Sequence, residues 1–162
     1  MSIQTVPTLR KATTEDLEAL VRLRLDFLRE TRKVKDEAIF SALEGECHRY
    51  FLAKIADESY HSWVAEAEGE IVACGGLIFI EKPPSPRHFS GKEALILNMY
   101  TTPAWRKHGL ATRILQDMLA FIKTTSAHRI CLYATQDGQP VYEKLGFVIK
   151  HNHVPEMELI WE

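Results

Sequence analysis

Apolar side chains recur along the chain with two periods, about 3.6 residues and two residues, which predict helices and strands respectively. The helical period is clearest in the stretch 107–124, whose broad apolar face carries Leu110, Ile114, Leu115, Met118, Leu119 and Ile122. The predicted elements, in chain order, are a strand at 8–12, a helix starting after Thr13, a helix at 36–55, strands at 62–67, 71–80 and 94–101, a helix at 107–124, a strand at 129–134, a helix at 139–145, and a pair of strands at 147–150 and 157–161.

The order of these elements predicts an α/β (α+β) fold. The turn residues 68–70 separate two strands and indicate an antiparallel hairpin, whereas the helix at 107–124 joins two strands as a βαβ crossover. Strand 94–101 is apolar almost throughout, which is typical of a central strand covered on both sides. We therefore expect a mixed, mostly antiparallel central sheet of about seven strands with helices on both faces. With 162 residues, the chain is expected to form a single domain over 1–162.

Composition narrows the function classes. The chain has 20 Lys and Arg against 22 Asp and Glu, and this balance argues against a nucleic-acid partner. No apolar run approaches the roughly 20 residues that cross a membrane, and the N-terminal residues do not resemble a signal peptide. Three widely spaced cysteines favour reduced thiols and a cytoplasmic protein. His151 and His153 lack further ligands nearby, so no metal site is expected.

The segment 100–112 carries the most informative chemistry. It reads as the end of a strand, a tight turn and the start of a helix, whose first N–H groups have no partner within the helix. Gly109 lets a ligand approach the backbone closely, while Arg106 and Lys107 add positive charge. Such a helix start binds anions, so we expect a diphosphate here. The glycine patterns of P-loop and dinucleotide-binding proteins are absent from the sequence.

Two motifs resemble those of the GNAT N-acetyltransferase superfamily. Residues 106–111 match its signature Arg/Gln-x-x-Gly-x-Gly/Ala, with Arg106, Gly109 and Ala111 at the defining positions. Residues 141–147 resemble its Leu-Tyr-x-x-x-Gly-Phe ending. The resemblance implies a GNAT-like fold that binds acetyl-CoA as cosubstrate and transfers an acetyl group to an amine, without a metal.

The resemblance also implies roles for individual residues. Pantetheine would lie along the strand residues Met99, Tyr100 and Thr101, and the Met99 N–H would donate to the thioester oxygen. Tyr142 would be the general acid that protonates the leaving thiolate. Gln136 stands near the position where the family often has a pantetheine-binding Asn. The diphosphate would be held beside Arg106 by the N–H groups of Lys107, His108, Gly109, Leu110, Ala111 and Thr112.

The general base and the acceptor stay open. Glu93 near the start of the central strand is one candidate base; the others are water, Asp137, His108, His88 and His151. We expect direct attack by the primary amine of a small molecule or peptide in a ternary complex, and a homodimer is compatible with the family. The alternative function is a catalytically silent acyl-CoA-binding sensor or interaction module, which would use the same turn. The phenol of Tyr142 favours the enzyme.

Overall fold

A single mixed sheet forms the centre of the computed structural model, which describes residues 6–32, 35–151 and 155–161. Its strands follow the order β1-β2-β3-β4-β5, with antiparallel pairs up to β4 and a parallel β4–β5 pair. The strands are β1 (Thr8–Lys11), β2 (Tyr60–Ala67), β3 (Glu70–Glu81), β4 (Lys92–Thr101) and β5 (Arg129–Leu132). The helices are α1 (Leu17–Arg32), α2 (Glu37–Ala56), α3 (Leu110–Ile122) and α4 (Gln139–Lys144), with 3-10 turns at Thr14–Asp16 and Pro103–Trp105.

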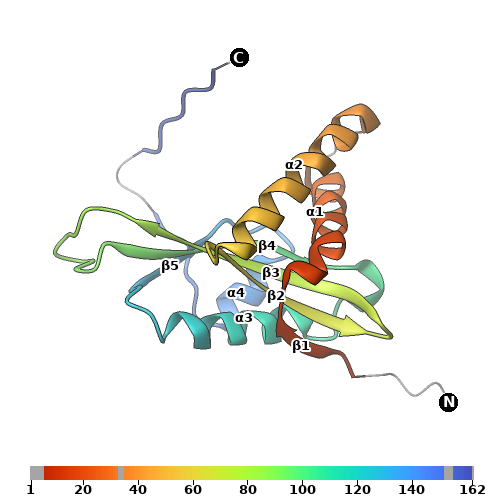
Figure 1. Ribbon diagram of the computed structural model, residues 1–162. Coiled ribbons are helices and arrows are strands. Elements are labelled where there is room, and N and C mark those ends of the chain that lie inside the picture. Colours follow the sequence, from red (N-terminus) through yellow and green to blue (C-terminus); the bar gives the residue numbers. More distant parts are fainter. Residues whose placement is uncertain (1–5, 33–34, 152–154, 162) are drawn as a thin grey trace.

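Helices cover both faces of the sheet, as the apolar pattern predicts. Helices α1 and α2 lie on one face, and α3 and α4 lie on the other (Figure 1). Leu20 and Leu23 of α1 pack with Phe51 of α2 and Tyr60 of β2 in the first core. The second core joins α3 to the opposite face through Ile114, Leu115, Met118, Val72 and Leu77. The mixed, mostly antiparallel sheet between two helical layers is therefore confirmed.

A partly buried ion pair fixes the start of the first helix. The carboxylate of Asp16 accepts two hydrogen bonds of 2.8 Å from the Arg10 guanidinium and one of 2.9 Å from the Thr13 N–H. The Thr13 hydroxyl in turn accepts from the Glu15 N–H, which completes a capping arrangement. Asp16 is buried, and the bonds from Arg10, followed by that from Thr13, hold the pKa of its carboxyl below the ordinary value. This contact joins β1 to the first helix.

The central strand β4 contains a bulge in its second half. Leu97 pairs with Gly76 and Tyr100 pairs with Cys74, so two residues of β4 lie opposite Gly75 alone. Asn98, at the bulge, has a left-handed backbone with φ 55°. Gly75 leaves room for the Met99 side chain, because a Cβ at Gly75 would lie 2.5 Å from the Met99 sulfur. The bulge bends the strand away from a regular ladder.

The sheet has five strands, so the expectation of about seven is wrong. The predicted strands at 147–150 and 157–161 have no regular structure in the described residues, and 152–154 lie outside them. The terminal segment instead leads away from the sheet (Figure 1). Its apolar side chains are 73–90% exposed at Met157, Leu159, Ile160 and Trp161. An alternating apolar pattern shows that a segment can form a strand, but pairing also requires a neighbouring edge, which the pattern does not specify.

Candidate active site

The turn between β4 and α3 contains two left-handed residues. Lys107 has φ 63° and Gly109 has φ 75°, so the helix starts at Leu110 and not at 107 as its apolar pattern predicts. The Arg113 N–H bonds to the Gly109 carbonyl at 3.0 Å, which is the first bond of the helical ladder. Within the described chain, no side chain caps this helix. The N–H groups of the first turn are therefore available to an anion, and the helix dipole favours one.

Gly109 keeps the approach to these N–H groups open. An ideal Cβ at Gly109 would meet no heavy atom within 4 Å, so the space beside the backbone there is free. Alternating backbone conformations such as those around Lys107 and Gly109 turn neighbouring N–H groups toward one side and form an anion-binding concavity. The turn thus fits a diphosphate group in charge and in shape.

The strand that precedes the turn has an unpaired edge. Parallel β5 pairs with β4 only along Glu93–Ile96, so within the described residues the side of β4 that faces β5 is unpaired along 97–101. The predicted residues Met99, Tyr100 and Thr101 lie on this stretch. The backbone groups of this stretch that have no other partner can bond to an extended ligand as they would to another strand. The Thr101 carbonyl already accepts from Arg106 Nε. The structure therefore places a strand-like binding edge directly before the anion-binding turn.

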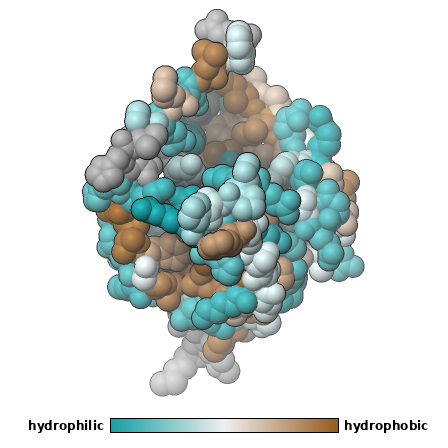
Figure 2. Space-filling model, turned by 90° about the vertical axis from the view of Figure 1, so that its left-hand side faces the viewer, coloured by the Kyte–Doolittle hydropathy of each residue, from teal (hydrophilic) through white to brown (hydrophobic). Residues whose placement is uncertain are grey.

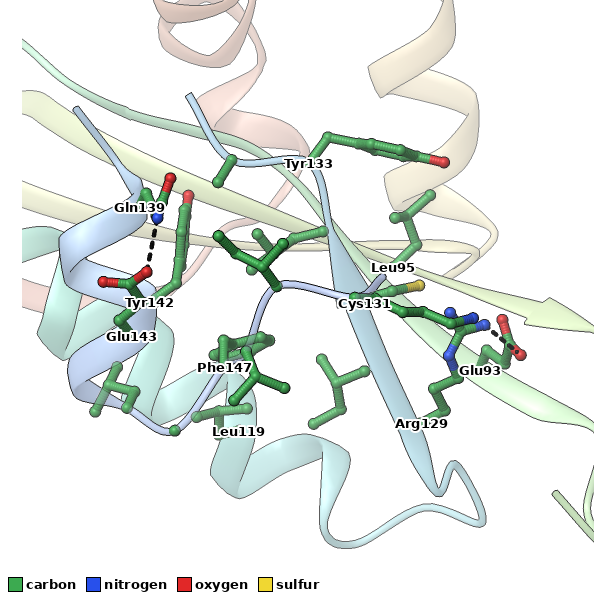
Figure 3. Close-up of a pocket in the computed structure, with 18 of the residues that line it drawn as sticks. Glu93, Leu95, Leu119, Arg129, Cys131, Tyr133, Gln139, Tyr142, Glu143 and Phe147 are labelled. Carbon is green, nitrogen blue, oxygen red and sulfur yellow. Dashed lines mark hydrogen bonds and ion pairs between the residues drawn. The ribbon is translucent and has the colours of Figure 1, made fainter. Parts of the chain in front are cut away.

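A cavity of about 990 Å³ lies along β5, α4 and the segment that follows α4. Leu95, Cys131, Tyr133 and Tyr142 are among the side chains that line it (Figure 3). On the side of the molecule that Figure 2 shows, apolar residues are visible in recesses between polar ones. An apolar cavity with a few polar groups is the usual form of a small-molecule site.

Tyr142 on α4 lies at one end of this cavity (Figure 3). Its ring packs edge-on against Phe147 at 6.0 Å, and only 9% of the residue is exposed. Burial disfavours the phenolate and raises the pKa of Tyr142 above its ordinary value. The phenol therefore stays protonated at neutral pH, as a proton donor must.

Glu93 lies at the other end of the cavity and forms two ion pairs. Its carboxylate accepts from Lys82 at 2.8 Å and from Arg129 at 2.9 Å, and only 4% of the residue is exposed. The bond from Lys82, followed by that from Arg129, lowers the pKa of Glu93. Glu93 lies six positions before Met99 on β4, which is about 20 Å at 3.3 Å per residue. The structure thus does not support Glu93 as a base beside the thioester.

The remaining candidates are placed as follows. The His108 ring lies in the turn, where Nδ1 is 2.8 Å from the Arg106 carbonyl. Gln136 is exposed in the connection between β5 and α4. In the parts of the chain that the structure describes, no group of three or more His, Cys, Asp or Glu side chains could hold a metal, and His153 lies outside those parts.

Glu30, in the last turn of α1, is a neighbour of the site that sequence reasoning missed. Its carboxylate accepts from the Tyr100 hydroxyl at 2.5 Å and from Arg106 Nη2 at 2.7 Å. Arg106 Nε also donates to the Thr101 carbonyl at 3.0 Å. Glu30 lies 70 residues from Tyr100 in sequence, and helical spacing marks it only as part of a polar face. No local signal connects it to the turn.

Comparison with known proteins identifies the chain as an acetyltransferase with this mixed sheet. The chain matches the model of the acetyltransferase (GNAT) family over residues 18–147, and it belongs to that family.

Solved structures agree with this assignment. A predicted acetyltransferase from Clostridium acetobutylicum, in a structure with acetyl-CoA, is 32% identical, with a TM-score of 0.83 over 94% of this chain and 96% of that one. A GCN5-related N-acetyltransferase from Ralstonia eutropha JMP134 is 29% identical, with a TM-score of 0.80 over 94% of this chain and 99% of that one.

No curated protein matches the chain. Among the described residues, no helix is both long and apolar enough to cross a membrane.

Proposed function

We propose that the protein transfers the acetyl group of acetyl-CoA directly to the primary amine of a small molecule or peptide, with both substrates bound together. One observation carries the proposal: the unpaired edge of β4 leads straight into the anion-binding turn at the start of α3. This order suits a ligand with an extended arm and a diphosphate at its end. The similar Clostridium acetobutylicum protein is described with acetyl-CoA, which supports the same cosubstrate here.

Binding would use the backbone more than side chains. The N–H groups of Lys107, His108, Gly109, Leu110, Ala111 and Thr112 would hold the diphosphate, and the Thr112 hydroxyl could add a bond. Met99, Tyr100 and Thr101 would hold the pantetheine arm along the open edge of β4. In this proposal Gln136 is the side chain nearest to the arm on the β5 side. Holding both reactants together would supply much of the rate by proximity.

The chemistry would need one oxyanion donor and one acid. The amine nitrogen forms a bond to the thioester carbon and loses a second proton to water, and the carbon–sulfur bond then breaks. The Met99 N–H would stabilise the negative charge on the carbonyl oxygen, an effect worth about 3 kcal/mol. Tyr142 would donate its proton to the departing sulfur and recover a proton from solvent. Because Glu93 is held in two ion pairs, we assign the proton of the incoming ammonium to water and not to Glu93.

The proposal is tested by measuring CoA release from acetyl-CoA with a panel of polyamines, amino acids, amino sugars and peptides. We expect one class of primary amine to accelerate thiol release, and calorimetry to detect CoA binding without an acceptor. CoA binding without turnover on any amine would favour the silent binding module instead. If calorimetry detects no binding of CoA or acetyl-CoA, the proposal is wrong.

A further inference from the structure

We propose that Glu30 is a positioning residue, which holds Arg106 and Tyr100 so that the diphosphate-binding turn keeps its shape. The inference rests on the proposed function, because it concerns the same turn. It also assigns a different role to Arg106: the guanidinium stabilises the turn through contacts within the protein, as a brace, and does not bind the diphosphate directly.

The contacts of Arg106 carry this inference. Its guanidinium donates to Glu30 and to the Thr101 carbonyl, and it lies over the Tyr100 ring at 5.6 Å. These three contacts bind the first residue of the signature to the end of β4 and to α1. A guanidinium that is bonded on two sides and stacked on a ring is held in one orientation. The residue that follows Arg106 is the left-handed Lys107, so the orientation of Arg106 directly affects the backbone of the turn.

Glu30 is the common partner in this group. One carboxylate oxygen accepts from Tyr100 and the other accepts from Arg106. Burial opposes its ionisation, but the bonds from Tyr100 and Arg106 outweigh burial and lower the pKa of Glu30. A carboxylate that is ionised and bonded through both oxygens is a strong and directional acceptor. It connects α1, which covers one face of β4, to the turn that follows β4.

The two roles of Arg106 predict opposite effects of removing the Glu30 charge. If Arg106 binds the diphosphate directly, Glu30 competes with the ligand, and Glu30→Gln tightens CoA binding. If Arg106 is a brace, Glu30→Gln loosens the turn and weakens CoA binding. Both side chains of the ion pair are about two-fifths exposed, so we expect the loss to be about two- to fivefold.

The experiment measures CoA affinity by calorimetry, and acetyl transfer from both acetyl-CoA and S-acetylpantetheine, which lacks the diphosphate. We expect Glu30→Gln to weaken CoA binding and raise the KM for acetyl-CoA, while kcat and the kinetics with S-acetylpantetheine stay unchanged. Arg106→Gln should weaken binding to a similar extent, and the double variant should be no weaker than either one. Glu18→Gln is the matched control, because the Glu18 carboxylate forms an exposed hydrogen bond with His48 at the other end of α1.

Three results would overturn the inference while the wild type still binds CoA and turns over: unchanged binding in Glu30→Gln, tighter binding in Glu30→Gln, or equal losses with acetyl-CoA and S-acetylpantetheine. Fully additive losses in the double variant would do the same, because they would mean that the two residues act separately. A wild-type protein that does not bind CoA would instead refute the proposed function, so the two failures are distinguishable.

Discussion

Substitution of Gly109 by alanine separates the ligand-binding role of the turn from its backbone strain. Gly109 has φ 75°, a conformation that costs an alanine about 1–2 kcal/mol. The new Cβ would touch nothing within 4 Å, so packing adds no further cost. For a domain of this size we expect the melting temperature to fall by about 2–8 °C.

The chain offers a matched control in Gly69, in the turn between β2 and β3. Its φ is 80°, and a Cβ there would also meet nothing within 4 Å. Gly69→Ala should therefore cost the same stability as Gly109→Ala. Gly69 belongs neither to the turn at 106–112 nor to the unpaired edge of β4, so its substitution should leave CoA affinity unchanged.

Gly109→Ala should in addition weaken CoA binding, because the methyl group would occupy the free space beside the N–H groups. Loss of one charge-assisted hydrogen bond costs about 1.5–3 kcal/mol, which corresponds to about a 10- to 150-fold loss of affinity. Calorimetry with CoA measures this directly, and the shift of the melting temperature with CoA gives an independent value. Equal CoA affinities of the two alanine variants would refute the assignment of the turn as the diphosphate site.

Three further predictions follow from individual side chains. Tyr142→Phe should lower kcat by about 10²–10⁴-fold, because general acid catalysis accelerates a reaction by that factor, and CoA affinity should change little. An unchanged kcat in the thiol-release assay would exclude the acid role. Glu93→Gln should destabilise the fold by about 1–3 kcal/mol in urea, because it removes charge from two ion pairs. It should leave the pH profile of kcat unchanged, whereas loss of the acidic limb, over which a general base loses its proton, would restore Glu93 as a base. Asp16→Asn should cost about 1.5–3 kcal/mol near neutral pH. The pKa of Asp16 is lowered on folding, so its contribution to the free energy of unfolding is present above about pH 4 and disappears as the pH falls through the folded-state pKa. In acid urea titrations, the free energies of unfolding of wild type and Asp16→Asn should therefore converge. A constant difference between them down to pH 2 would contradict the ion-pair account.

The position of the candidate site could be predicted from sequence because its signals are local. The apolar strand at 94–101, the charged residues Arg106 and Lys107, and Gly109 are close together in the chain and indicate a turn there. The helix start itself was predicted too early, because the left-handed Lys107 and Gly109 delay it to Leu110. The helix at 36–55 and the strands around 62–80 were also predicted from local signals and are observed close to their predicted bounds. The βαβ crossover through α3 also followed from element order.

Other features depended on contacts between distant parts of the chain. The two terminal strands were predicted to complete the order of elements, and they do not form because an apolar segment does not by itself supply a partner edge. Glu93 looked like a free carboxylate until Lys82 and Arg129 were placed on either side of it.

The sequence by itself determined the layers of the fold, the anion-binding turn and the residues of the two motifs, since each depends on backbone conformation or periodicity within a few turns of chain. Only the tertiary structure decided which charges neutralise one another, how far β5 pairs with β4, and that Glu30 meets Arg106. Charge pairing and strand pairing depend on distances in space, and residues as far apart in sequence as Glu93 and Arg129, or Glu30 and Arg106, carry no sequence pattern that fixes those distances.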